Sequence, residues 1–195
     1  MLKTTALLLE ELKNYANGPN KIKRMADRGE FIPITKGLYE TDKTVPGYYL
    51  AACIYGPSYL SFDFALSYYG LIPEAVYNFT SATFGKRKQK EFTNYFGTFT
   101  YRDIPKAVYP YGILLKEEKG YCYQIATPEK ALCDKLYTVE PLYTLKALKA
   151  FLFEDLRIDE KEFAQLNKKD IFELAKLYGS TNIKLLAKYL GEKNE

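Results

Sequence analysis

The sequence predicts an α+β protein, on the evidence of three patterns along its 195 residues. Apolar residues recur at helical spacing near the N-terminus and again over the C-terminal third. Between these regions, residues 75–125 contain short segments rich in aromatic and β-branched residues that alternate as strands do. The composition, 47% apolar and 27% charged, is typical of a folded core with a soluble surface.

The N-terminal region predicts two helices. Residues 2–16 form an apolar stripe that includes Leu8 and Leu12, as in an amphipathic helix. Pro19 suits the first turn of a second helix, which we expect to end at Gly29 because glycine readily adopts the left-handed conformation of a helix end.

A strand pair follows these helices. Residues 31–34 and 38–39 read as short strands around a basic turn at residues 35–37. Two helices and a strand pair are the closing elements of a winged helix-turn-helix, which usually has three helices. The sequence therefore predicts a truncated winged-helix module over residues 1–46.

Residues 47–195 predict a second, larger domain. A helix is expected over residues 48–55, and Ser61 is placed to cap another helix that ends at Gly70. The predicted strands are residues 75–80, 90–95, 98–102, 112–116 and 121–125. Gly120 fits a hairpin turn, and we expect an antiparallel sheet.

The chain from about residue 127 predicts a helical tail. Thr127 at the cap, Pro128 in the first position and Glu129 in the first turn form a strong helix start. Further helix starts are expected at Asp159 and Asn167.

The composition excludes several classes of chemistry. Histidine is absent, which rules out imidazole acid–base catalysis and His-ligated zinc. Cys53, Cys122 and Cys133 are widely spaced among apolar neighbours, so we expect buried free thiols and no metal site. No catalytic residue and no cofactor is predicted. The apolar run at residues 7–9 is too short for a signal peptide, and no segment spans a membrane, so a cytoplasmic protein is expected.

The second predicted helix carries a cationic stripe. Lys21, Arg24 and Arg28 recur at i, i+3 and i+7, with Lys23 and the turn residue Lys36 nearby. Such a face can neutralise DNA phosphates, although a merely solvated helix face would look the same.

A second basic cluster follows the first predicted strand. It contains Lys86, Arg87, Lys88, Lys90 and, later, Arg102. Tyr95, Phe96, Phe99 and Tyr101 interleave with it, and cations beside exposed aromatic rings can bind single strands or RNA. Lysines that block strand addition at a sheet edge explain the same residues.

Two weaker candidates remain. The segment from Thr127 to Asp134 could hold an anion at a helix start, or could simply be a well-capped helix with a Lys130–Asp134 pair. Asp103 with Glu117 matches the loose spacing of metal-dependent nucleases, although Glu117 falls near the predicted hairpin tip.

Short motifs along residues 20–140 resemble the AbiEi-like antitoxin family of type IV toxin–antitoxin, or abortive-infection, systems. They are Ile22-x-x-Met25-x-x-x-Gly29, Lys36-Gly37-Leu38-Tyr39, the serine–alanine–leucine–glycine block at 58–71, Gly97-x-Phe99 and Pro128-Glu129-Lys130-Ala131-Leu132-x-Asp134. The resemblance implies a non-enzymatic antitoxin whose winged helix binds the promoter DNA of its own operon. It also implies a nucleotidyltransferase-like toxin as partner, without requiring a stable complex, and leaves open a homodimer.

The sequence therefore supports three hypotheses. The first is an antitoxin and autoregulatory transcriptional regulator that uses Lys21, Lys23, Arg24, Arg28 and Lys36. The second is an interaction module that binds no DNA and antagonises the toxin or its substrate through residues 84–106. The third is a metal-dependent nuclease.

Overall fold

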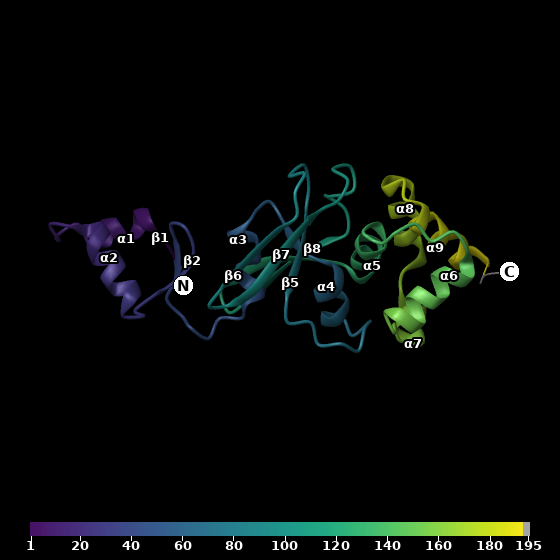
Figure 1. Cartoon of the computed structure of the whole chain (residues 1–195), viewed down its shortest axis with the longest axis horizontal. Helices are drawn as coiled ribbons and strands as arrows, with labels where there is room; N and C mark the ends of the chain where they lie inside the picture. The colour runs from purple at the N-terminus through teal and green to yellow at the C-terminus, as the bar shows by residue number, and fades with distance from the viewer. Residues whose placement is uncertain (193–195) are drawn as a thin grey trace.

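The computed structural model describes residues 1–192 and is an elongated α+β protein (Figure 1). A three-stranded antiparallel sheet with two helices forms one end of the molecule, and a six-stranded mixed sheet forms the centre. The C-terminal helices form the other end. This arrangement confirms the predicted α+β class and the helical C-terminal region.

The N-terminal unit has five elements. They are β1 (Leu2–Thr4), α1 (Thr5–Glu11), α2 (Gly18–Asp27), β2 (Ile32–Thr35) and β3 (Leu38–Glu40). The sheet order is β1-β3-β2, and both pairings are antiparallel. The predicted helix at residues 2–16 is therefore wrong at both ends. The Thr4 hydroxyl accepts the Leu7 N–H at 3.2 Å and so caps a shorter helix.

This unit has a small core of its own. Leu8, Ile22 and Phe31 are buried together, and the Tyr39 ring meets Phe31 edge-on at 5.2 Å. The second helix ends as predicted, since Gly29 follows it with φ of +69°.

The next segment crosses into the central sheet. It contains a 3₁₀ turn (Gly47–Leu50), α3 (Ala51–Ile54), β4 (Tyr59–Leu60) and α4 (Phe62–Tyr68). A Cβ atom at Gly47 would lie 2.3 Å from the Phe79 ring, so only glycine fits where the chain meets the sheet. Ser61 occupies the predicted cap position without capping, because its hydroxyl donates to Asp134 on a later helix.

The central sheet is mixed rather than antiparallel. Its other strands are β5 (Phe79–Thr83), β6 (Lys90–Asn94), β7 (Gly97–Asp103), β8 (Ile113–Glu118) and β9 (Tyr121–Ala126). The order is β6-β7-β5-β4-β9-β8, and the β4–β9 and β5–β7 pairs are parallel. The two-residue strand β4 joins the halves of the sheet, and a strand so short has no periodicity to detect in sequence.

Helices complete the described chain. They are α5 (Pro128–Tyr137), α6 (Leu145–Ala150) with a π turn (Phe151–Asp155), α7 (Glu160–Gln165), α8 (Lys168–Tyr178) and α9 (Thr181–Glu192). The Thr127, Asp159 and Asn167 side chains accept N–H groups of the following turns, which confirms these predicted caps.

The three cysteines are free, but only Cys133 is buried. The expectation of three buried thiols was wrong for Cys53 and Cys122. Cys122 alternates along β9 with the core-facing Tyr121 and Tyr123 and therefore faces solvent.

A buried polar network ties the helical region to the sheet. Lys130 and Asp134 of α5 are fully buried, and their side chains pair at 3.2 Å. The Asp134 carboxylate also accepts the hydroxyls of Tyr59 (2.9 Å), Ser61 (2.6 Å) and Tyr178. Lys130 donates to the Tyr178 hydroxyl at 2.6 Å. Burial lowers the pKa of Lys130, and this effect outweighs the nearby negative charge of Asp134, which raises it.

We expect Asp134→Ala to lower the free energy of unfolding by about 3–5 kcal/mol, because it leaves the Lys130 ammonium buried without a counter-charge. Urea denaturation measures this loss. The double variant Lys130→Met with Asp134→Leu is the control and should recover most of the loss. A cost below about 1 kcal/mol for Asp134→Ala would contradict a buried charged pair.

Candidate nucleic-acid interface

The cationic helix α2 is well defined at both ends. The Asn17 side chain accepts the Asn20 N–H at 3.2 Å, and Pro19 lies in the first turn. The inner face of the helix is anchored by Ile22, which packs on the small N-terminal core. The opposite face is therefore fixed toward solvent.

The structure brings three of the predicted residues together. Lys21, Arg24 and Arg28 line a shallow hollow of about 360 Å³ on the outer face of α2, together with Asp27. The Lys21 ammonium lies 4.6 Å from the centre of the Tyr15 ring, a cation–π contact that orients the side chain.

Lys23 and Lys36 lie apart from this group. Lys23 lines a different hollow, beside Pro33 and Tyr39. Lys36 is exposed on the turn between β2 and β3, and this turn is fastened to α1 because the Thr5 N–H donates to the Gly37 carbonyl at 2.9 Å. The five predicted residues thus divide into a stripe of three and two flanking lysines.

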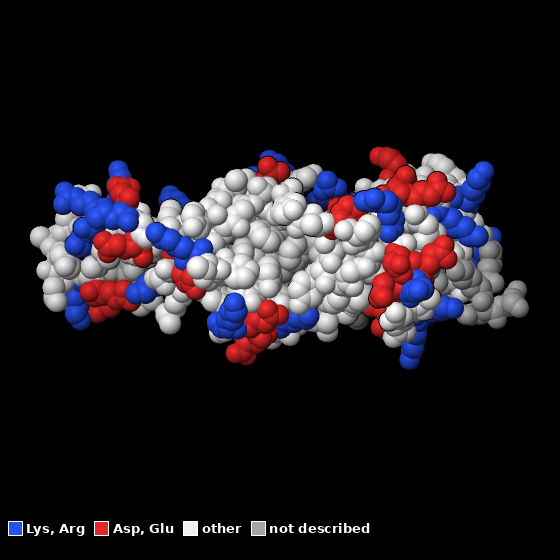
Figure 2. Space-filling model, turned by 90° about the horizontal axis from the view of Figure 1, so that it is seen from below, with Lys and Arg blue, Asp and Glu red and all other residues white. Residues whose placement is uncertain are grey.

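Acidic side chains partly offset the stripe. Arg28 pairs with Glu30 at 2.9 Å on the surface, and Asp27 shares the hollow. Figure 2 shows basic and acidic side chains side by side at this end of the molecule. Because exposed pairs are weak, a phosphate group can compete with Glu30 for the Arg28 guanidinium.

The stripe is not covered by the rest of the protein. Helices α1 and α2 form the end of the molecule farthest from the C-terminal helices, with the β1–β3 sheet between them and the central sheet (Figure 1). A long partner such as a duplex can therefore approach α2 without meeting the central domain.

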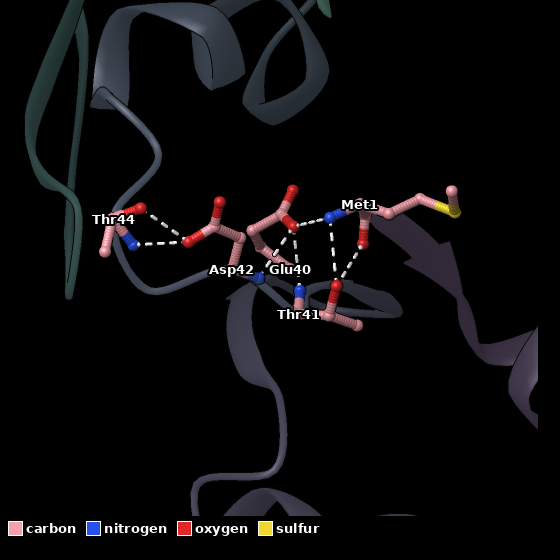
Figure 3. A network of polar contacts seen from close by, with 5 residues as sticks. All are labelled: Met1, Glu40, Thr41, Asp42 and Thr44. Carbon is pink, nitrogen blue, oxygen red and sulfur yellow. Dashed lines mark hydrogen bonds and ion pairs between the residues drawn. The ribbon is translucent and has the colours of Figure 1, made fainter. Parts of the chain in front are cut away.

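A buried carboxylate helps to hold the N-terminal unit in place. Glu40, at the end of β3, is fully buried and accepts the Met1 ammonium and the N–H groups of Thr41 (2.8 Å) and Asp42 (3.0 Å), as Figure 3 shows. Burial alone would raise the Glu40 pKa, but these hydrogen bonds and the facing Tyr121 hydroxyl on β9 bring it below its usual value.

A second contact joins the same two parts of the chain. The Asn94 amide on β6 donates to the Ile34 carbonyl on β2 at 3.0 Å. Ile34 itself is buried in the main core rather than in the small N-terminal one. The orientation of α2 relative to the central sheet is therefore set by specific contacts.

The second basic cluster is divided between the two faces of the sheet. Lys90 on β6 stands opposite Tyr101, whereas Arg102 is the next residue along β7 and so faces the other side. Lys86 donates to the Gly56 carbonyl at 3.0 Å and lies over the Tyr55 ring. The Arg87 N–H donates to Asp103 at 2.7 Å.

The prediction that exposed aromatic rings beside this cluster form a stacking surface was wrong for three of the four rings. Phe99 and Tyr101 are fully buried, and Phe96 is nearly so, while Tyr95 is 62% exposed. The aromatic residues alternate with polar ones because they form the core face of β7. Strand β6 lies at the edge of the sheet, where lysines also prevent pairing with another chain.

The residues of the nuclease hypothesis are not brought together. Asp103 lies on β7 and Glu117 on β8, with three strands between them in the sheet. At about 4.8 Å per strand, this separates them by roughly 19 Å. Within residues 1–192, no three acidic or cysteine side chains are grouped to hold a metal ion.

The Thr127–Asp134 segment has a structural role, and the sequence did not show how deeply its side chains are buried. Helical spacing predicts the Lys130–Asp134 pair, but it predicts a surface pair. Glu129 accepts the Asn167 N–H at 2.8 Å and so joins α5 to the start of α8. The tyrosines that reach Asp134 come from distant segments, so no local signal could have found this network.

Comparison with known proteins gives no family for the chain: no protein-family model and no curated protein matches it. In the part of the chain that the structure describes, no helix combines the length and apolar character needed to cross a bilayer.

We expect the contribution of Glu40 to stability to depend on pH. Because the folded-state pKa lies below the ordinary value of 4.5, the contribution is present above about pH 4.5 and is lost as the pH falls through the folded value. The measurement is urea denaturation of the wild type and Glu40→Gln from pH 7 to pH 3. The difference, on the order of 1–3 kcal/mol at pH 7, should shrink in acid. A difference that stays constant with pH would contradict this role.

Proposed function

We propose that this chain is the antitoxin of a type IV toxin–antitoxin (abortive-infection) system and an autoregulatory transcriptional regulator that binds its own promoter. The observation that carries the proposal is the cationic stripe on α2, formed by the half-buried Lys21 and the exposed Arg24 and Arg28, beside a three-stranded sheet at the free end of the molecule. Cations held on one helix face neutralise phosphates along a duplex.

The order of elements supports a winged-helix-like module over residues 1–46. Strand, helix, helix and strand pair follow one another, and the first strand pairs with the last. In this arrangement α2 is the recognition helix. Its ten residues span about 15 Å, a length that fits a major groove roughly 12 Å wide. Lys23, which lies elsewhere on α2, and Lys36, on the turn between β2 and β3, flank the stripe and can reach the neighbouring phosphates.

The remaining residues, 47–195, form the antitoxin domain in this proposal. Its partner is a nucleotidyltransferase-like toxin, which it opposes without catalysis and without needing a stable complex. The protein acts in the cytoplasm. A homodimer would place two copies of α2 on two half-sites of one operator and would offset the small size of each module.

The test is binding to duplex DNA from upstream of the protein's own reading frame, measured by fluorescence anisotropy over a range of salt concentrations. We expect Arg24→Ala with Arg28→Ala to weaken binding at low salt. Loss of two phosphate contacts should also reduce the slope of log K against log salt by about 1.8. The matched control is Lys146→Ala with Lys184→Ala, two exposed cations on α6 and α9. DNA binding is contradicted if the native promoter does not bind at low salt, or if the arginine variant binds as the control does.

A second function rests on the basic loop before β6, whose backbone is held by the Arg87–Asp103 hydrogen bond. A loop fixed in this way can present Lys88, together with Lys90 at the start of β6, to the toxin or to its substrate, with no use of DNA.

Charge reversal at Lys86, Arg87 and Lys88 separates the two functions. For the leading proposal, we expect these three changes to Glu to leave both promoter binding and rescue of growth from the toxin near wild-type levels. Co-expression with the toxin measures rescue, and anisotropy measures DNA binding. Loss of rescue with promoter binding intact would favour the second function.

A further inference from the structure

A polar pocket of about 300 Å³ lies between one face of the central sheet and the helices α4 and α5. Its floor is a row of side chains across three strands. Thr100 on β7 stands opposite Thr80 on β5 and opposite Glu91 on β6, so all three point to one face of the sheet. Arg102 follows two residues along β7 on this same face and also lines the pocket.

Two helices form the wall of the pocket. Phe62 and Asp63 line it from the start of α4, and Lys135 and Thr138 line it from the end of α5. Phe62 adopts φ of +54°, a left-handed conformation that is costly for a bulky residue and that recurs at ligand-binding sites. Phe62 is also part of the buried core, since it is only 4% exposed.

Two of the four charged side chains that line the pocket are paired with each other, and two are not. Lys135 and Asp63 pair at 2.7 Å and neutralise each other. Neither Arg102 nor Glu91 takes part in any of the side-chain hydrogen bonds or ion pairs found within residues 1–192. Asp103, the acid next to Arg102, is occupied by the Thr83 hydroxyl and the Arg87 N–H. The pocket thus offers one free guanidinium and one free carboxylate.

We propose that this pocket binds a mononucleotide. The planar guanidinium of Arg102 matches two oxygens of a phosphate. Glu91 can accept the hydroxyls of a ribose, as acidic residues do in other nucleotide sites. Asn78 and Gln89, which also line the pocket, carry amides of the kind that bind base edges. The volume is at the lower end of the range for small-molecule sites, which suits one nucleotide and no more.

This inference is independent of DNA binding by α2, because the pocket lies in the central sheet. Failure of one proposal leaves the other untouched. The proposal also separates Arg102, which would bind the nucleotide, from the other basic residues of its cluster. These do not line the pocket: Lys86, Arg87, Lys88 and Lys90.

The test is isothermal titration calorimetry of the full chain with AMP, CMP, GMP and UMP, and with the matching nucleosides and inorganic phosphate. We expect at least one mononucleotide to bind with a dissociation constant of roughly 10⁻⁵–10⁻³ M, and its nucleoside at least tenfold more weakly. Arg102→Gln should weaken the nucleotide at least tenfold, while Lys146→Gln, an exposed cation on α6, should not.

The Arg102 side chain makes no hydrogen bond or ion pair in the described residues, so Arg102→Gln should fold, and its thermal unfolding provides the check. The proposal is overturned if no mononucleotide binds at millimolar concentration. It is also overturned if Arg102→Gln binds as the wild type does, or if inorganic phosphate binds as tightly as the nucleotides.

Discussion

The central sheet and the C-terminal helices depend on one buried polar network, whose centre is the carboxylate of Asp134. It accepts hydrogen bonds from the hydroxyls of Tyr59 in β4 and Ser61 just after it, and it pairs with Lys130 within α5. Since Tyr178 of α8 joins the same group, one side chain links the middle of the sheet to the C-terminal helices. Removing either charged residue would leave the other one buried without a counter-charge. The members of the network therefore stabilise the fold cooperatively.

Glu40 has a similar role where the N-terminal unit meets the central sheet. It is buried where the N-terminal sheet meets Tyr121 of the central sheet. The cationic stripe on α2 is thereby held at the far end of an elongated body, while the polar pocket around Arg102 lies on the central sheet. The two proposals thus concern two separate surfaces of different chemistry, one proposed to bind a long polyanion and the other a small molecule.

Local signals in the sequence predicted the elements that depend on local physics. Pro19 and Gly29 mark the ends of α2, Thr127 marks the start of α5, and Gly120 marks the β8–β9 hairpin. The stripe on α2 follows from helical spacing alone. Elements that depend on distant partners were missed. Leu2–Thr4 is a strand only because β3 lies beside it, and β4 is too short to show a period.

The same limit explains the errors at the candidate sites. Phe99 and Tyr101 alternate with polar residues whether their face is buried or exposed, so the sequence could not say that they belong to the core. Arg102 was grouped with Lys90 by proximity in the chain, whereas strand geometry places the two side chains on opposite faces. The pocket joins residues from five segments, and no single segment carries its signature.

Lysine acetylation footprinting of the full chain, with and without duplex DNA from its own promoter, tests most directly whether α2 is the surface that meets DNA. The account predicts that promoter DNA slows acetylation of Lys21 and Lys23, while Lys146 and Lys184 react as before. Protection confined to Lys86, Lys88 and Lys90, with α2 unprotected, would contradict it.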